Sequence, residues 1–387
     1  MKSSQFYNFT EEQIAFKKQM DEFVHNEIRP HAREWDESEK CPLEIFEKLA
    51  SLECLATGFP EEVGGVGGML ELLLLIESLA AGSAGVALSV YVHMALACAA
   101  IASLGNDDQK ERYLLPAMKG EKLGCWAYAE PNAGADVTAV QCHARPDGEG
   151  FILNGSKLYI TNGTFADFVV LVGRTSQGAG LKGISLFIVE KEQPGFARNE
   201  MKKLGMRSSE LAELVFTDCR LSREQLLGPL DSGFRSAIQV LSRGRAVAAA
   251  FACGLAGEAL RQTVEHVSNR QQHGAPLSNN QFIRFTLADM KTRLEASRLM
   301  TYASARLIDA GKPFDLECTI AKLFATESAT WICERALHLH GAQGYMMESD
   351  IQRFYRDCKV LEFGEGTNEI QREMISAAML RRSNPGH

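Results

Sequence analysis

The sequence lacks the features of a disulfide-stabilised, metal-binding or nucleic-acid-binding protein. Its ten cysteines include no C-x-x-C pair, and its 387 residues carry a net charge of −8 without a long block of lysine and arginine. Scattered cysteines of this kind predict reduced thiols in the core and no metal site. The acidic balance argues against a nucleic-acid partner. No signal or transit segment is recognisable at the N-terminus, so we expect a cytoplasmic protein.

The stretch from Ser78 to Asn106 lacks formal charge, and the sequence also lacks a dinucleotide-binding fingerprint. The helical part of this stretch, Val86–Leu104, approaches the length of a membrane span. Alanine, serine, cysteine and valine dominate it and His93 lies within it, which favours a helix buried in a soluble bundle and no membrane span. The glycine-rich segment 59–68 does not have the G-x-G-x-x-G spacing, and no predicted strand precedes it.

What the sequence does contain is a change of periodicity along the chain. Helical spacing of apolar residues predicts an N-terminal all-helical domain (1–119) and a C-terminal helical bundle (232–387). Between them, turns rich in glycine, asparagine and serine separate short β-forming runs, which predicts a small antiparallel β domain (120–231). We therefore expect a mostly α protein with a central β domain. The expected strands are Phe151–Gly155, Lys157–Thr161, Phe168–Gly173, Ile184–Glu190 and Glu213–Thr217.

Near the C-terminus, one carboxylate stands between two glycines. Gly364 and Gly366 flank Glu365, so the backbone can turn tightly there, and Thr367 has the position of an N-cap for the helix that follows. A buried carboxylate at such a turn has a raised pKa and a fixed direction, which suits a general base that removes a proton from carbon. The alternative is a surface turn rich in acid and glycine.

The segment Glu365–Gln371, Glu-Gly-Thr-Asn-Glu-Ile-Gln, resembles the catalytic signature of the acyl-CoA dehydrogenase family. In that family the glutamate before Gly-Thr removes the substrate α-proton, and FAD accepts the β-hydride at N5. The resemblance implies the same role for Glu365, a trans-2-enoyl thioester as product, and cofactor contacts from Thr367, Asn368 and Glu369. It also implies the order helices, sheet, helices, and it extends over essentially the whole chain.

Two segments of the expected β domain resemble the parts of the family that hold the flavin. Trp126–Asp136, with Glu130-Pro-Asn-Ala-Gly, is similar to the segment that cradles the flavin ring, and Tyr159-Ile160-Thr161-Asn-Gly163 is similar to the segment that lies against it. Three positions in these segments depart from the family pattern: alanine replaces threonine, alanine replaces serine and tyrosine replaces tryptophan. The resemblance therefore does not predict the redox potential of the flavin. The implied cofactor contacts are Trp126, Tyr128, Ala129, Gly134, Ala135, Tyr159, Ile160 and Thr161. Without the resemblance, both segments read as ordinary strands and turns.

A second group of implied cofactor contacts lies in the C-terminal bundle. Arg270 and Gln281 match positions that reach the pyrophosphate of FAD from a neighbouring subunit, so the resemblance implies a homo-oligomer, most simply a homotetramer. Arginine is well suited to a diphosphate. The segment His338-Leu-His-Gly341-Ala342 matches a Gln-x-x-Gly-Gly segment near the adenosine, with two departures. No cysteine or carboxylate lies at ligand spacing around its histidines, which argues against zinc.

The implied substrate site involves Ser242, Arg245, Gly364, Gly366 and Ala135. Some relatives carry the catalytic glutamate at the position of Gly244, and many straight-chain enzymes carry tyrosine at that of Gly364. Two missing side chains predict a wide cavity for a branched, cyclic or arylated acyl group. The family also implies an electron-transfer flavoprotein as acceptor. Two alternatives stay open: an acyl-carrier-protein-linked dehydrogenase, and a non-catalytic flavin-binding member of the fold.

Overall fold

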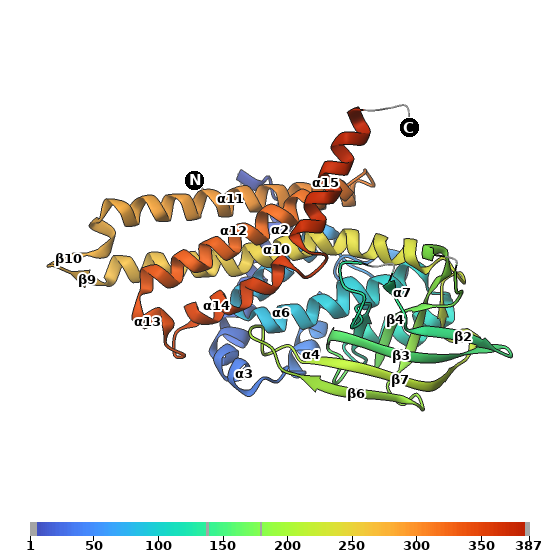
Figure 1. Cartoon of the computed structure of the whole chain (residues 1–387). Coiled ribbons are helices and arrows are strands. Elements are labelled where there is room, and N and C mark those ends of the chain that lie inside the picture. The colour runs from blue at the N-terminus through green and yellow to red at the C-terminus, as the bar shows by residue number, and fades with distance from the viewer. Residues whose placement is uncertain (1–5, 137–138, 179, 384–387) are drawn as a thin grey trace.

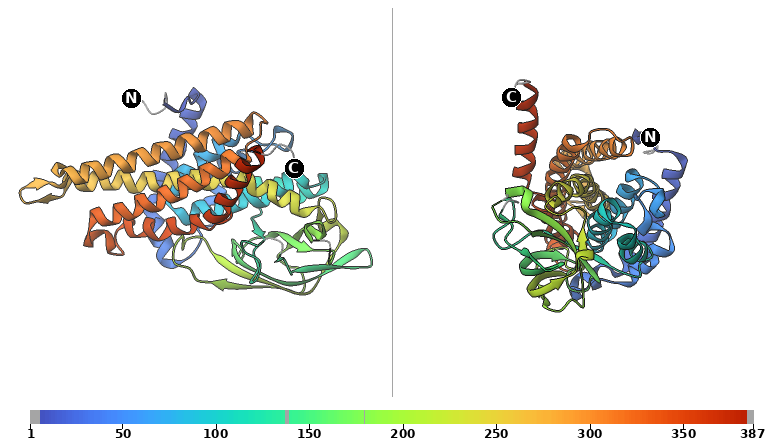
Figure 2. Two further views of the ribbon diagram at one scale, coloured as in Figure 1. Left: turned by 45° about the horizontal axis from the view of Figure 1, so that its top comes forward. Right: turned by 90° about the vertical axis from the view of Figure 1, so that its right-hand side faces the viewer.

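The computed structural model describes residues 6–136, 139–178 and 180–383 and has three successive parts (Figure 1). Helices come first along the chain, a β-sheet follows, and long helices form the last part. This order confirms the predicted fold class, mostly α with a central β domain. The sheet lies on one side of the molecule and helices from both ends of the chain lie on the other (Figure 2).

Short helices make up the first part. The N-cap is the one expected from the sequence, because Thr10 Oγ1 accepts a hydrogen bond from Gln13 N–H at 3.2 Å and the Gln13 side chain accepts one from Thr10 N–H. The elements are α2 (Glu11–Phe23), η1 (Val24–Ile28), η2 (Arg29–His31), α3 (Ala32–Ser38), α4 (Glu44–Ser51), η3 (Cys54–Ala56), η4 (Glu61–Val63), α5 (Met69–Gly82), α6 (Ala84–Tyr91), η5 (Val92–Cys98), α7 (Ala99–Leu104), α8 (Asp107–Gln109), η6 (Lys110–Leu114) and α9 (Leu115–Met118).

The uncharged stretch forms a continuous run of helix from Ala84 to Leu104 that is long and apolar enough to cross a membrane, yet 89% of its apolar 18-residue segment is buried inside the protein. His93 explains part of this burial. Its Nε2 donates to the Ala117 carbonyl at 3.2 Å and its Nδ1 accepts from Gly124 N–H at 3.0 Å, so the ring joins the helix to the start of the sheet. Burial lowers the pKa of His93 to about 4, which keeps the ring neutral.

The central part is a twisted sheet with the strand order β6-β7-β3-β2-β4-β5-β8, and β1 pairs with β4. Most pairs are antiparallel, as predicted, but β1 and β2 each pair with β4 in parallel. The two runs expected at 151–155 and 157–161 form a single strand, β3, with irregular register against β7. The strands are β1 (Gly124–Ala127), β2 (His143–Asp147), β3 (Gly150–Thr161), β4 (Phe168–Arg174), β5 (Ile184–Glu190), β6 (Phe196–Met201), β7 (Leu211–Leu221) and β8 (Leu226–Leu227).

A long helix, α10 (Gly233–Asn269), begins beside the sheet and runs through the last part of the molecule (Figure 1). It packs closely on α5, since a Cβ atom on Gly254 would lie 2.1 Å from the Glu77 carbonyl oxygen. The final helix stands away from the body of the protein (Figure 2). The remaining elements are β9 (Gln271–Gln272), β10 (Ala275–Pro276), η10 (Leu277–Asn279), α11 (Gln281–Asp309), α12 (Asp315–His340), α13 (Ala342–Tyr345), α14 (Asp350–Cys358), η11 (Lys359–Glu362) and α15 (Asn368–Ser383).

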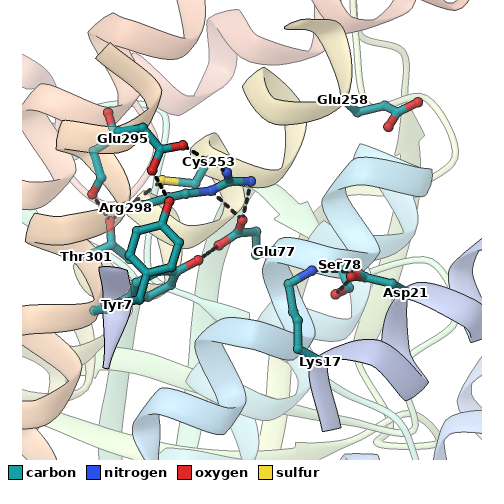
Figure 3. A network of polar contacts seen from close by, with 12 residues as sticks. Tyr7, Lys17, Asp21, Glu77, Ser78, Cys253, Glu258, Glu295, Arg298 and Thr301 are labelled. Carbon is teal, nitrogen blue, oxygen red and sulfur yellow. Dashed lines mark hydrogen bonds and ion pairs between the residues drawn. The ribbon is translucent and has the colours of Figure 1, made fainter. Parts of the chain in front are cut away.

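A buried polar network joins the first and last parts (Figure 3). Glu77 on α5 accepts from Arg298 Nε on α11 at 2.9 Å and from the Tyr302 hydroxyl. On the other side of Arg298, Tyr7 donates to Glu295, which is within 3.6 Å of the guanidinium. Two carboxylates therefore surround one buried guanidinium, and the pair across α5 and α11 fixes how these helices face each other.

All ten cysteines lie within the described residues, where they are buried and form no disulfide. Burial raises the pKa of Cys41 to about 12 and that of Cys54 to about 11, so both are inert thiols at neutral pH. Within the described ranges, no group of three or more histidine, cysteine or acidic residues could hold a metal ion.

Candidate active site

Glu365 lies in the turn between η11 and α15 with a left-handed backbone, φ +56°, and Gly366 follows at φ +84°. The predicted N-cap is present, because Thr367 Oγ1 accepts from Ile370 N–H at 3.3 Å. The Glu365 side chain is not a surface group. Its Oε2 oxygen is completely buried and has no hydrogen-bond partner among the described residues. The turn therefore delivers an unpaired carboxylate oxygen into the protein interior.

Gly244 on α10 and Tyr91 at the end of α6 enclose this carboxylate. A Cβ atom on Gly244 would lie 2.9 Å from Glu365 Oε2 and 2.8 Å from the Tyr91 hydroxyl oxygen. The space beside Gly244 is thus already filled, and Gly244 does not widen a cavity as the sequence suggested. At Gly364, an added Cβ atom would meet only the Val360 carbonyl oxygen within 4 Å, at 3.3 Å, so the expectation of extra width there stays a prediction.

Burial raises the pKa of Glu365 above its usual value, and three neighbours act in the opposite direction: Tyr91, Arg245 and Lys322. Desolvation disfavours the charged carboxylate, while a hydroxyl donor and two cations favour it. A carboxylate with a raised pKa is a stronger base than one in water, and the nearby cations favour its ionised form. The site therefore has the electrostatics of a general base.

Two buried side chains hold the turn in place. Lys322 Nζ on α12 donates to the Gly366 carbonyl at 2.9 Å and to Asn368 Oδ1 at 2.8 Å. Gln371 Nε2 donates to the carbonyls of Glu365 at 3.1 Å and Gly366 at 3.0 Å. Burial lowers the pKa of Lys322 to about 8, so its ammonium group is still charged at neutral pH. Together they satisfy the carbonyls of the strained turn.

Arg245 is the second cation of the site and is itself buried. Its Nη1 donates to Ser242 Oγ at 3.2 Å, whereas its Nε has no partner among the described residues. Burial lowers the pKa of Arg245, and Glu365 is the first of the charges that oppose this effect. The structure thus brings Ser242 and Arg245, one turn apart on α10, together with Glu365, which lies far from them in the sequence. Gly366, by contrast, is exposed.

The expected flavin segments lie side by side because of a buried ion pair that the sequence did not reveal. Lys157 Nζ on β3 lies 2.6 Å from Glu130 Oε1 and also donates to the Tyr128 carbonyl at 3.0 Å. Leu158 N–H donates to the Ala129 carbonyl at 2.9 Å. These contacts join the segment after β1 to the end of β3. The two residues of this ion pair are far apart in the sequence, so no local pattern predicts that they meet.

Tyr159 has a left-handed backbone, φ +60°, and its side chain is 63% exposed, whereas Ile160 beside it is buried. Asn162, also left-handed at φ +65°, donates through Nδ2 to the Ser89 carbonyl at 2.9 Å and so attaches the end of β3 to α6. Thr161 is half-buried at the end of β3. An aromatic ring is therefore presented outward next to the Ala129 segment.

Unpaired buried polar atoms indicate that these residues fit a flavin. Trp126 Nε1 and the Tyr128 hydroxyl are buried without a hydrogen-bond partner among the described residues. A heterocycle with carbonyl and ring-nitrogen acceptors would pair with both, and the exposed ring of Tyr159 offers an apolar plane. Gly134 and Ala135 are exposed in the adjoining loop, and a Cβ atom on Gly134 would meet nothing within 4 Å. Asn368 Nδ2 is a further buried donor without a partner.

The second group of expected cofactor contacts lies far from this site within one chain. Arg270 follows the last residue of α10, at the end opposite the sheet, and α10 rises about 40 Å between Arg245 and Arg270 at 1.5 Å per residue. His340 stacks on His266 there, with ring centroids 4.2 Å apart, so the segment His338–Ala342 lies at the same end. Gln281 begins α11 after the β9–β10 hairpin. Glu369 is exposed at the start of α15.

Sequence reasoning missed three residues of the site: Tyr91, Lys322 and Lys157. Tyr91 lies in an apolar helix, where a tyrosine reads as part of the core. Lys322 is buried in α12 at a position that looks like an ordinary helical lysine. A slight signal was available for Lys322, because it falls on the same helical face as the buried Cys318 and Ala325.

Three segments of the chain match successive domains of one family: residues 10–121 match the acyl-CoA dehydrogenase N-terminal domain, residues 125–219 the middle domain and residues 231–380 the C-terminal domain. A similar protein is the short-chain specific acyl-CoA dehydrogenase of Clostridium acetobutylicum, 37% identical over 97% of this chain and 100% of that protein.

Solved structures agree with these matches. Butyryl-CoA dehydrogenase from Megasphaera elsdenii superimposes with a TM-score of 0.94 at 36% identity, covering 97% of this chain and 100% of that one. A chain in a structure of the electron transferring flavoprotein of Acidaminococcus fermentans also gives a TM-score of 0.94 at 36% identity, covering 97% of this chain and 99% of that one.

Proposed function

Because the chain belongs to the acyl-CoA dehydrogenase family, as a flavoprotein oxidoreductase acting on CH–CH bonds, we propose that Glu365 is its catalytic base. The proposed reaction converts an acyl-CoA thioester to its trans-2-enoyl thioester. One observation carries the assignment: the Glu365 carboxylate is buried, has a raised pKa and faces the position of Gly244 on α10. A base of this kind contributes roughly 10²–10⁴-fold to the rate.

The protein's own groups divide the work around the α-carbon. Glu365 takes the α-proton and becomes a neutral acid, while Arg245 and Lys322 keep it ionised before the step. Hydrogen bonds from Lys322 and Gln371 hold the turn, so the carboxylate direction is set before the substrate binds. A donor at the thioester carbonyl would stabilise the enolate-like charge, and the backbone N–H of Glu365 is the proposed donor.

FAD is the proposed cofactor, and when bound it accepts the hydride from the β-carbon. Trp126, Tyr128 and Asn368 present unpaired buried polar groups, and Tyr159 presents its ring. Ala129, Ile160, Thr161, Thr367 and Glu369 remain proposed contacts of the same cofactor, as do Gly134 and Ala135. Arg270, Gln281, His338, Gly341 and Ala342 would reach it only from a second subunit, since they lie at the far end of the bundle.

For the acyl group we propose a short chain with a bulky substituent near the reacting carbons. The similarity to short-chain and butyryl-CoA enzymes favours the short chain. Width from a branch, ring or aryl group now rests on Gly364 alone, because Tyr91 and Glu365 fill the space beside Gly244. Ser242, Arg245 and Gly366 are further proposed contacts of the substrate.

A homotetramer is the proposed assembly. Large apolar side chains are exposed on α11, α13 and α15, among them Phe282 (63%), Tyr345 (77%) and Leu380 (69%). Such a surface suits subunit contacts better than water. For the electron acceptor we propose an electron-transfer flavoprotein, in keeping with the similar chain found in a structure of one. Ten buried thiols without disulfides fit a reducing compartment, which is why we propose the cytoplasm.

Anaerobic titration of the FAD-loaded protein with a panel of acyl-CoA thioesters tests the proposal. Loss of flavin absorbance with a short or branched acyl-CoA is the expected result, and the acyl group with the largest amplitude defines the specificity. If acyl groups on acyl carrier protein reduce the flavin and CoA thioesters do not, the substrate carrier is acyl carrier protein and not CoA. No bleaching with either carrier would leave a flavin-binding protein without dehydrogenase activity and would overturn the assignment of Glu365.

A further inference from the structure

The hydroxyl of Tyr91 is buried beside the Glu365 carboxylate, and no other group in the described part of the protein accepts its hydrogen. Tyr91 is 4% exposed and is the last residue of α6, directly before the wide helical turn η5. Turns of this kind inside helices often occur at functional sites. A buried hydroxyl without a partner destabilises the folded protein, so its placement needs a reason.

The position of the Tyr91 hydroxyl identifies Glu365 as its hydrogen-bond partner. The Tyr91 hydroxyl oxygen and Glu365 Oε2 both lie within 3 Å of the point where Gly244 would carry a Cβ atom, at 2.8 and 2.9 Å. Oε2 is equally without a partner among the described residues. One oxygen has a hydrogen to donate and the other is an acceptor, so each supplies what the other lacks. The bare backbone of Gly244 provides the room in which they meet.

We propose that Tyr91 is a positioning residue of the active site, whose hydroxyl donates a hydrogen bond to Glu365 and keeps this base ionised and correctly directed. The inference rests on the proposed role of Glu365 as the base. Tyr91 transfers no proton: its O–H bond stays intact while Glu365 receives the α-proton of the substrate. Gly244 is the third member of the arrangement, because any side chain there would separate the two oxygens.

The effect of Tyr91 on the ionisation of Glu365 can be separated from the effect of the neighbouring charges. Arg245 on α10 and Lys322 on α12 also favour the ionised carboxylate, and burial opposes it. Burial and the adjacent carboxylate raise the pKa of Tyr91 well above its usual value, so the phenol stays protonated and remains a donor throughout the working pH range. Removing the hydroxyl leaves Arg245 and Lys322 unchanged and takes away one stabilising contact of the carboxylate.

The test compares the pH dependence of flavin reduction in the wild type and in Tyr91→Phe. The rate should fall at low pH as Glu365 is protonated, and in the variant this fall should move to higher pH by about one pH unit, the size expected for one hydrogen bond to a charged group. Rates should differ about tenfold below the transition and little above it. A mere loss of packing would lower the rate equally at every pH.

A second readout needs no substrate. In infrared difference spectra of the substrate-free protein, the carboxylic acid band that disappears in Glu365→Gln belongs to Glu365, and its midpoint should rise in Tyr91→Phe. Tyr302→Phe is the matched control, since it removes a buried hydroxyl from Glu77 on α5 and should leave this midpoint in place. If Tyr91→Phe does not fold, Gly244→Ala inserts a methyl group between the two oxygens and should move the midpoint in the same direction.

The outcomes distinguish the two claims. If the protonation midpoint of Glu365 is unchanged in every folded variant, the proposed role of Tyr91 is wrong. An inactive Glu365→Gln variant would still support Glu365 as the base in that case. A Glu365→Gln variant with normal flavin reduction overturns the base itself, whatever the behaviour of Tyr91→Phe.

Discussion

At the scale of single residues, the proposed function depends on one turn, in which Glu365 has an unfavourable backbone conformation. Glu365 adopts φ +56°, a left-handed conformation that costs a non-glycine residue about 1 kcal/mol or more. The flanking glycines cannot remove this strain. Hydrogen bonds from Lys322 and Gln371 to the turn carbonyls offset it. Strain retained at a buried carboxylate is typical of a functional position.

The first prediction concerns Glu365→Gln. The amide has nearly the same shape, so folding and FAD content should stay the same, but it cannot accept the α-proton. We expect flavin reduction to slow roughly 10²–10⁴-fold. Stopped-flow absorbance measures the rate, and the flavin-to-protein ratio serves as the control for folding. Flavin reduction at the wild-type rate would contradict the assignment.

The second prediction moves the base to another helix. A Cβ atom on Gly244 would lie 2.9 Å from Glu365 Oε2, so a glutamate at position 244 needs the space that residue 365 now fills. Gly244→Glu should therefore recover more activity when combined with Glu365→Gly than with Glu365→Gln. Partial flavin reduction in the first double variant, against little in the second, is the expected pattern. Equal rates would show that the two positions do not share one space.

At the scale of elements, α12 holds the Glu365 turn through Lys322, and Thr326 on the same helix also donates to Asn368 Oδ1. Lys322 Nζ contacts the Gly366 carbonyl and Asn368 Oδ1 from the middle of the helix. Loss of the ammonium group removes one charged donor from each oxygen, while Gln371 still donates to the Gly366 carbonyl and Thr326 to Asn368 Oδ1. A hydrogen bond from a charged group contributes roughly 1.5–3 kcal/mol. The same loss also removes a charge that keeps Glu365 ionised.

The third prediction follows for Lys322→Met. The pKa of Glu365 should rise, so activity at acid pH should fall more than activity at alkaline pH, and the melting temperature should drop. The matched control is Lys359→Met, since Lys359 is half exposed and pairs with Glu362 at the surface of the same turn. A surface pair contributes about 1 kcal/mol or less. Equal losses in both variants would argue against an anchoring role for Lys322.

The fourth prediction concerns the polar network between α5 and α11 (Figure 3). Glu77→Leu leaves the Arg298 guanidinium buried without its main partner, which costs roughly 3–5 kcal/mol. Glu77→Leu with Arg298→Met removes both charges and should recover most of that loss. Urea denaturation followed by circular dichroism measures both variants, with Lys18→Met in an exposed ion pair as control. A double variant as unstable as the single one would show that the charges are not coupled.

At the scale of the whole molecule, the proposed cofactor contacts of one chain form two groups that lie far apart. Trp126 and Tyr159 lie at the sheet, whereas Arg270 lies at the far end of α10, about 40 Å along the helix from Arg245. No motion of loops closes such a distance within a rigid helix. The proposed pyrophosphate contact of Arg270 therefore requires the flavin of another subunit.

The fifth prediction uses Arg270→Ala. If this arginine binds the pyrophosphate across a subunit interface, the variant should fold and assemble but lose FAD on gel filtration, and added FAD should restore the flavin. Light scattering gives the assembly, and the absorbance ratio gives the FAD content. Arg293→Ala, which removes a guanidinium stacked on Trp331 within the chain, is the control and should retain its flavin. A monomer that holds FAD tightly would refute the shared site.

Local patterns in the sequence determined the order of the three parts, the cap at Thr10 and the turn around Glu365. Each of these depends on residues a few positions apart, where helical periodicity, capping and glycine act directly. The family signature added the proposed identity of the base, because this signature is a contiguous segment.

Tertiary structure alone decided what surrounds that base. Tyr91, Gly244 and Lys322 come from three helices that are far apart in the sequence, and none has a local pattern that marks it. The sequence suggested open space beside Gly244, but in the structure other side chains fill that space. A glycine in a sequence shows only that its own side chain is absent, and it does not show which neighbours occupy the space. Lys157 and Glu130 likewise meet only when β3 packs against the segment after β1. Burial and long-range proximity set the pKa of Glu365, and both exist only in the folded chain.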